Sequence, residues 1–124
     1  MDPIVTTEQG RIRGFTHDNA LVFLGIPYAA APVGDHRFGP PQPHPRWEGT
    51  KDAVRYGATA LQPKQDFTLI PEPLIEGDNC LNLNIFTPEL GDACLPVIVW
   101  IHGGGFLSGC SASPWYRGAR FARD

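Results

Sequence analysis

Three consecutive glycines, Gly103 to Gly105, follow His102 at the end of the apolar run "VIVWI". Adjacent glycines are costly, because each loses more backbone freedom on folding than any other residue. A glycine-rich turn between a buried strand and a helix commonly presents backbone N–H groups to an anion. Such groups could bind a phosphate, a dinucleotide or the oxyanion of a reacting carbonyl, so the flanking residues must distinguish the three.

Two nucleotide-binding interpretations fail on those flanking residues. The spacing G-x-x-x-x-G of a phosphate-binding loop is present, but Cys110 follows it where that loop needs a lysine. The dinucleotide pattern G-x-G-x-x-G would need a third glycine where Ser108 stands. Neither pattern supports a nucleotide site.

An oxyanion hole is the chemistry that best fits the segment "HGGGF". Two or more backbone N–H groups must point at one oxygen, and side chains there would block the substrate carbonyl. Each such donor lowers the reaction barrier by roughly 3 kcal/mol. From these residues alone, a tight turn that binds no ligand remains the alternative.

A nucleophile is missing beside this segment. The attacking serine of such an enzyme stands in G-x-S-x-G at a turn from a strand to a helix. Ser111, in "GCSAS", lacks the second glycine and follows no strand of its own, and Ser108 and Ser113 fit no better. We therefore expect this chain to contain no nucleophile.

The N-terminal part of the chain has the pattern of short strands. Apolar and alternating runs predict strands at 4–7, at 11–15 and within 20–29, where Pro27 and the following Ala-Pro end the run, with a hairpin turn at 8–10. Residues 32–45 hold five prolines and predict an irregular surface segment. The stretch 61–79 has three prolines and no clear period, so we expect a long loop.

The second half predicts two strands and a helix. In "LNLNIF" the apolar residues alternate with Asn82 and Asn84, which predicts a half-buried strand. Residues 95–102, "LPVIVWIH", predict a strand covered on both faces, typical of a parallel sheet. One helical turn is expected within 47–57. Ser113 and Pro114 are an N-cap and first position for a helix over 115–124.

Composition bounds the class of protein. The chain has 124 residues, 42% of them hydrophobic, which suits one domain with a core. A net charge of −3 with scattered basic residues argues against nucleic-acid binding. The N-terminus has no apolar signal segment, and the longest apolar run is too short to cross a membrane. Three cysteines without metal spacing predict free thiols, no metal and, if Met1 is the true start, a cytoplasmic protein.

Four ordered segments then carry a family resemblance. They are "VTTEQGRIRGF", "VFLGIPYAAAPVGDHRFGPPQP", "GDNCLNLNIFTP" and "PVIVWIHGGGF". Together they resemble the type-B carboxylesterases, the family that includes bacterial para-nitrobenzyl esterases and animal cholinesterases. Esterases of the hormone-sensitive-lipase type share the last segment but lack the second and third. The resemblance covers nearly the whole chain.

The resemblance implies a fold and an activity. The family has the α/β-hydrolase fold, with a small antiparallel N-terminal sheet beside a larger mixed sheet. It hydrolyses small carboxylic esters with a Ser–Glu/Asp–His triad and no cofactor. Carried over to this sequence, Gly104 and Gly105 match the glycines that donate N–H bonds to the oxyanion. His102, Gly103 and Phe106 support the loop, and the family's catalytic histidine lies elsewhere.

Two positions depart from the family pattern. Arg37 matches an arginine that pairs with the signature glutamate, but Asp78 stands at that position here. We expect the shorter acid to form the ion pair, with two independent surface charges as the alternative. Cys80 matches the signature cysteine, whereas Ala60 stands at its partner's position, consistent with a reducing compartment and a bacterial-type protein.

The sequence thus predicts that residues 1–124 are the N-terminal part of a single carboxylesterase domain, cut before the nucleophile. Such a segment supplies the oxyanion loop and is inactive by itself. The alternative is a non-catalytic relative that uses the fold for binding, as neuroligins do. The intact "HGGGF" favours the enzyme, since a binding protein has little need of it.

Overall fold

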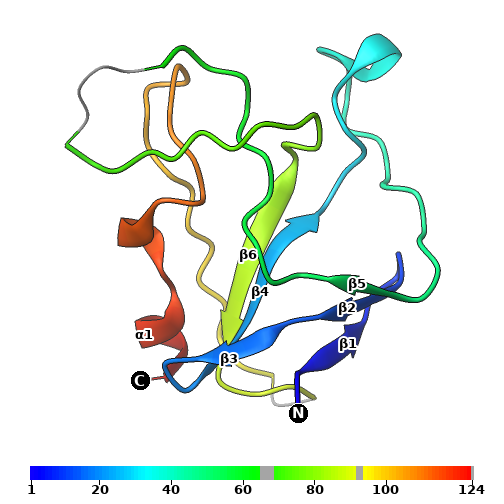
Figure 1. The fold of residues 1–124 in the computed structure, drawn as a ribbon, viewed down its shortest axis with the longest axis vertical. Helices are drawn as coiled ribbons and strands as arrows, with labels where there is room; N and C mark the ends of the chain where they lie inside the picture. The colour runs from blue at the N-terminus through cyan, green and yellow to red at the C-terminus, as the bar shows by residue number, and fades with distance from the viewer. Residues whose placement is uncertain (65–68, 92–93, 124) are drawn as a thin grey trace.

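Two small three-stranded sheets form the centre of the molecule (Figure 1). The computed structural model describes residues 1–64, 69–91 and 94–123. One sheet has the order β1 (Ile4–Thr6), β2 (Arg11–Arg13), β5 (Thr50–Asp52). The other has the order β3 (Phe15–His17), β4 (Ala20–Pro27), β6 (Asn82–Thr87).

The chain opens with the predicted hairpin. β1 and β2 pair antiparallel. The N–H of Thr7 donates to the carbonyl oxygen of Gly10 at 2.9 Å, and Gly10 donates back at 3.3 Å. This confirms the turn expected at 8–10.

The third strand of this sheet corrects one prediction. β5 lies parallel to β2, and Arg13 Nη2 lies 2.7 Å from Asp52 Oδ1 across the pair. The helical turn predicted within 47–57 is therefore wrong, because these residues extend along β2 and use its free edge. The small sheet is mixed and not wholly antiparallel.

The run predicted as one strand at 11–15 divides at Gly14. A Cβ atom at this position would collide with the carbonyl oxygen of Val22, so the close approach of two strands requires glycine. The chain then enters the second sheet as β3 and turns at Asp18 and Asn19. Both have positive φ, 51° and 60°, as a two-residue type I′ hairpin requires.

β4 is the most buried strand and joins the two sheets. The N–H of Leu24 donates to the carbonyl oxygen of Ala53 at 2.8 Å, just beyond β5. The core is a cluster of buried residues with partly buried neighbours: Ile12, Phe23 and Ala53, then Val5, Leu21, Ile26 and Trp47. Burying an aliphatic side chain contributes about 2 kcal/mol, so this cluster stabilises the N-terminal half.

β6 confirms the predicted alternating strand but reverses its faces. It pairs antiparallel with β4. Asn82 and Asn84 are half-buried, whereas Leu83 and Ile85 are exposed. The asparagines face inward because their amides bind the backbone: Asn84 Oδ1 accepts from the N–H of Gly25 at 2.9 Å, and Asn82 Nδ2 donates to loop carbonyls.

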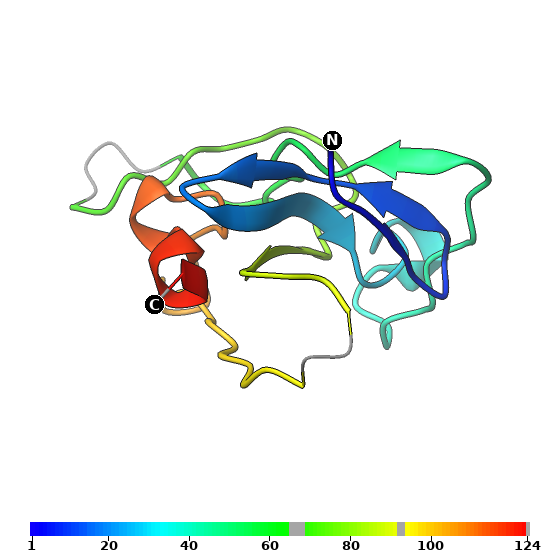
Figure 2. The same cartoon turned by 90° about the horizontal axis from the view of Figure 1, so that it is seen from below.

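The strand predicted at 95–102 is not formed. This segment is the gold trace in Figures 1 and 2, and within the described residues it belongs to neither sheet. Val97 and Ile101 remain 84% and 85% exposed. A strand needs a hydrogen-bonded neighbour, and no described strand pairs with this segment.

Two short helical segments end the chain. Ser113 caps the first, η2 (Pro114–Tyr116), because its Oγ accepts from the N–H of Trp115 at 3.3 Å. The predicted cap is confirmed, but extended backbone at Arg117 separates η2 from α1 (Ala119–Arg123). Figure 2 shows α1 beside the second sheet, where Gly118 lets it approach the Phe86 ring.

The proline-rich segment is irregular, as predicted. Within 32–45 the only regular element is the 3₁₀ turn η1 (Gly34–His36). The described parts of 61–79 likewise contain no helix or strand. Both segments are therefore loops in their described parts.

Candidate functional site

The glycine segment forms a tight turn with left-handed backbone. Gly104 has a φ of 126°, Gly105 of 61° and Phe106 of 63°. The carbonyl oxygen of Gly104 accepts from the N–H groups of Leu107 and Ser108, each at 3.1 Å. A Cβ atom at Gly104 would collide with the carbonyl oxygen of Ser108. Glycine at 104 is therefore required by both its φ and its surroundings.

The amides at the front of this turn are free to bind an external acceptor. Among the described residues, none of the N–H groups of Gly103, Gly104 and Gly105 donates to a protein acceptor. A Cβ atom at Gly103 or Gly105 would meet nothing within 4 Å, so the space beside them is open. Unpaired donors on a side-chain-free surface are what an oxyanion site needs.

His102 lies against the inner side of the turn. Its Nδ1 is 2.8 Å from the carbonyl oxygen of Gly103. It also packs so closely on Gly109 that a Cβ atom there would collide with the ring. Phe106, by contrast, is fully exposed. His102 and Gly103 thus contact each other and Gly109 within the turn, and the supporting roles of His102, Gly103 and Phe106 stay predictions.

Two side-chain amides hold the segment after the turn, and one of them, Gln62, lies outside the segments that carry the family resemblance. Gln62 forms two 2.9 Å hydrogen bonds with the backbone of Gly109. Asn84 Nδ2 donates to the carbonyl oxygen of Ser111 at 3.3 Å. The expected long loop at 61–79 was the only sequence signal near Gln62, and nothing in its composition indicated this contact.

The structure does not bring Arg37 and Asp78 together. Both are exposed, and neither takes part in an ion pair within the described residues. The Arg37 guanidinium lies 5.0 Å from the centroid of the Phe38 ring instead. Of the two alternatives, independent surface charges describe this arrangement.

No serine or cysteine near the turn is arranged as a nucleophile. Within the described residues the Ser111 hydroxyl makes no hydrogen bond, and the Ser113 hydroxyl caps η2. Cys80, Cys94 and Cys110 are free thiols, as predicted. Burial, aided by the charge of Glu72, raises the pKa of the Cys110 thiol, so it stays protonated and poorly nucleophilic at neutral pH.

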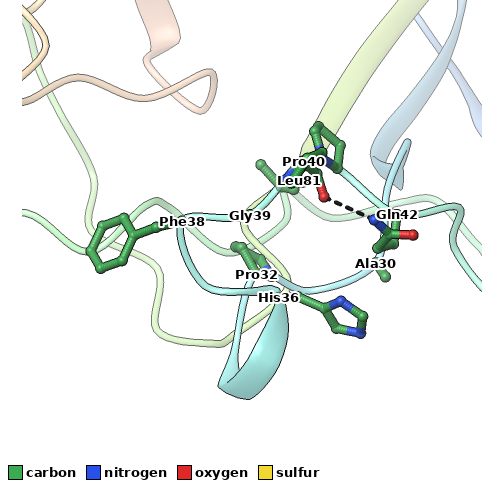
Figure 3. A pocket seen from close by; sticks show the side chains of 9 residues that line it. Ala30, Pro32, His36, Phe38, Gly39, Pro40, Gln42 and Leu81 are labelled. Carbon is green, nitrogen blue, oxygen red and sulfur yellow. Dashed lines mark hydrogen bonds between the residues drawn. The ribbon is translucent and has the colours of Figure 1, made fainter.

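A separate cavity of about 240 Å³ lies beside η1 (Figure 3). Apolar groups of Ala30, Pro32 and Leu81 form much of its lining. The Phe38 ring, though part of the rim, points away from the other side chains in Figure 3. In Figure 1 this loop and the glycine turn lie on opposite sides of the molecule, so the cavity is not part of the oxyanion segment.

Comparison with known proteins decides the family. The sequence model described as "Carboxylesterase family" matches residues 1–124, the whole chain. The chain belongs to the carboxylesterase family. The "HGGGF" turn lies within the matched residues, and its role as an oxyanion segment remains what the resemblance implies.

The most similar relatives of this carboxylesterase chain include two bacterial hydrolases. It is 40% identical over 123 residues to the para-nitrobenzyl esterase of Bacillus subtilis, covering 96% of this chain and 24% of that protein. It is 42% identical over 127 residues to the phenmedipham hydrolase of Pseudarthrobacter oxydans, covering 98% and 26%. The chain thus spans about a quarter of the length of the relatives that it matches.

Solved structures show the same fold. A PNB esterase matches with a TM-score of 0.88 and 40% identity, covering 98% of this chain and 25% of that one. The Geobacillus stearothermophilus carboxylesterase EST55 matches with a TM-score of 0.85 and 41% identity, covering 97% and 24%. The carboxylesterase chain therefore has the fold of the N-terminal part of an α/β-hydrolase, as predicted. No helix in its described part is long and apolar enough to cross a membrane.

Proposed function

We propose that residues 1–124 supply the oxyanion hole of a serine carboxylesterase that acts on small-molecule carboxylic esters. The observation that carries this proposal is the row of amides at Gly103–Gly105, none of which donates to an acceptor among the described residues, on a turn that requires glycine at position 104. When a serine attacks an ester carbonyl, negative charge develops on its oxygen. The N–H groups of Gly104 and Gly105 would donate to that oxygen and stabilise it more in the transition state than in the substrate.

We also propose that the segment is the N-terminal part of a single α/β-hydrolase domain that precedes the nucleophile. The serine, the acid and the catalytic histidine would then lie in the part of the relatives' length that this chain does not cover. The free cysteines agree with a reducing compartment such as the cytoplasm, and the net charge of −3 argues against a nucleic-acid partner.

A chimera tests the proposal. Residues 1–124 would replace the matching segment of the Bacillus subtilis para-nitrobenzyl esterase, which is 40% identical over 123 residues. We expect the chimera to hydrolyse para-nitrophenyl acetate, because the host supplies the triad and this chain supplies the hole. A chimera that unfolds cooperatively and yet is inactive would contradict the proposal.

The 124-residue chain by itself is the negative control for this experiment. We expect it to hydrolyse para-nitrophenyl acetate no faster than its Ser111→Ala variant, since no serine hydroxyl near the turn is hydrogen-bonded to a base among the described residues. A rate for the unsubstituted chain clearly above that of the variant would reinstate Ser111 as a nucleophile.

The neuroligin-like binding protein is the weaker candidate. A protein that only binds has no need for a turn with three unpaired amides, and the relatives reported above are named as hydrolases. Activity of the chimera, lost on blocking its oxyanion turn, would separate the two functions.

The chimera also settles the pair Arg37 and Asp78. Because both side chains are exposed and form no ion pair within the described part of the chain, we expect Arg37→Ala and Asp78→Ala to change the free energy of unfolding additively, within about 0.5 kcal/mol. Urea unfolding of the single and double variants gives the coupling energy. A coupling well above that value would establish the ion pair that the resemblance implied.

A further inference from the structure

We propose that Gln62 is a positioning residue of the oxyanion turn, fixing the turn through the backbone of Gly109. This inference rests on the function proposed above. It places a residue from the long loop at 61–79 in the support of a turn some forty residues later. The contact, and not any sequence motif, carries the inference.

The Gln62 amide and the Gly109 backbone bind each other in both directions. Gln62 Nε2 donates to the carbonyl oxygen of Gly109 at 2.9 Å, and Gln62 Oε1 accepts from the N–H of Gly109 at 2.9 Å. The remaining Nε2 proton reaches the carbonyl oxygen of Ala60 at 3.1 Å. Three hydrogen bonds thus fix the orientation of the side chain, and only a side chain with both a donor and an acceptor can make the pair to Gly109.

Gly109 transmits this constraint to the turn. It is buried, has a φ of 106°, and lies so close to Gly103 and His102 that a Cβ atom would strike both. Its backbone therefore packs directly against His102 and Gly103, the residues that precede the proposed oxyanion donors. A shift of Gly109 would displace Gly103 and His102, and with them the N–H of Gly104.

A second amide limits movement just beyond Gly109. Asn84 accepts from Gly25 on β4 and donates to the carbonyl oxygen of Ser111 at 3.3 Å, which ties this end to the second sheet. The front of the turn, in contrast, has no hydrogen bond from the amides of Gly103–Gly105 within the described residues. The donors are thus unpaired and able to meet a substrate. Their positions are held by the side chains that bind the segment behind them.

The expected effect is on the chemical step. Displacing a preorganised donor by about 1 Å costs on the order of 100-fold in rate, while ground-state binding of a small ester depends little on it. Loss of the Gln62 contacts should therefore lower kcat by about 10- to 100-fold and leave KM within about twofold. A merely structural role would lower the melting temperature without this selective loss of kcat over KM.

The test uses the active chimera with Gln62→Ala and Gln62→Glu. The second variant keeps the length of the side chain and its acceptor, but its carboxylate repels the carbonyl oxygen of Gly109. Gln42→Ala is the matched control, because Gln42 Nε2 donates only locally, to the carbonyl oxygen of Pro40 at 3.2 Å. The measurements are kcat, KM, melting temperature and the affinity for a trifluoromethyl ketone, whose adduct with the serine carries an oxyanion.

We expect both Gln62 variants to lose kcat and ketone affinity by similar factors, with KM and the Gln42→Ala variant unchanged. Unchanged kcat in Gln62→Glu, or a loss confined to melting temperature, would overturn the positioning role and leave the proposed function intact. A folded but inactive unsubstituted chimera would instead overturn the proposed function, and the role of Gln62 with it.

Discussion

Gly104→Ala should lower kcat of the chimera by about 100- to 1,000-fold, the effect expected for loss of an oxyanion donor. The added methyl cannot be accommodated. It would collide with the carbonyl oxygen of Ser108. The N–H of the same residue closes the turn by donating to the carbonyl oxygen of Gly104 at 3.1 Å. The φ of 126° is also one that alanine strongly disfavours, so the turn must change shape.

That change should destabilise the transition state more than the bound substrate. Rotating the backbone at 104 redirects its own N–H and the next one, at Gly105, away from the shared oxygen. The ground-state carbonyl carries less charge and loses less, so KM should stay within about twofold. Because this exposed turn belongs to neither sheet, the substitution should lower the melting temperature by only a few degrees.

Steady-state kinetics on para-nitrophenyl acetate, with thermal unfolding beside it, measures this result. Gly39→Ala is the matched control, since a Cβ atom there would meet nothing closer than the carbonyl oxygen of His36 at 3.5 Å, an ordinary contact. If Gly104→Ala retained the kcat of the control, the N–H at 104 would not be an oxyanion donor. A donor set that begins at Gly105 would then be the interpretation to test.

Local signals in the sequence were sufficient where residues act on near neighbours. The hairpin at 8–10, the strand that became β4 and the Ser113 cap depend on turn chemistry and alternation within a few residues. The glycine turn belongs to the same class. Its φ values and open amides follow from three adjacent residues without side chains.

Predictions failed where distant partners decide the structure. β5 became a strand because β2, almost forty residues earlier, had a free edge. The faces of β6 reversed because the amides of Asn82 and Asn84 bind loop backbone from inside. Gln62 is the same case within the site: its role depends on Gly109, and no local pattern encodes that contact.

The 124-residue chain, expressed by itself, should aggregate at micromolar concentration, and residues 97–101 should be the cause. All five side chains of this segment, "VIVWI", are at least 68% exposed, and no described strand pairs with its backbone. β-branched and aromatic residues without charge or proline favour intermolecular strands. Burying each such side chain against another copy contributes about 2 kcal/mol, which the isolated chain does not otherwise gain.

Charge placed within the segment should prevent this association. In Val97→Glu/Val99→Glu the two carboxylates fall on one face of any strand that forms, because side chains alternate with period two. Like charges then face each other between copies and oppose pairing. The net charge moves from −3 to −5, so a control of equal charge is required. Leu61→Glu/Leu69→Glu supplies it, because those leucines are 96% and 81% exposed outside the segment.

Size-exclusion chromatography with light scattering, and thioflavin fluorescence, compare the three proteins. We expect the Val97/Val99 variant to raise the soluble monomeric fraction several-fold, while the control variant stays close to the unsubstituted chain. Equal rescue by both variants would mean that net charge and not this segment controls association. A monodisperse 13.6 kDa species of the unsubstituted chain with a sharp thermal transition would contradict the prediction outright. Residues 1–124 would then be a domain that is stable without further chain, and residues 95–102 would form a solvent-exposed surface segment of it.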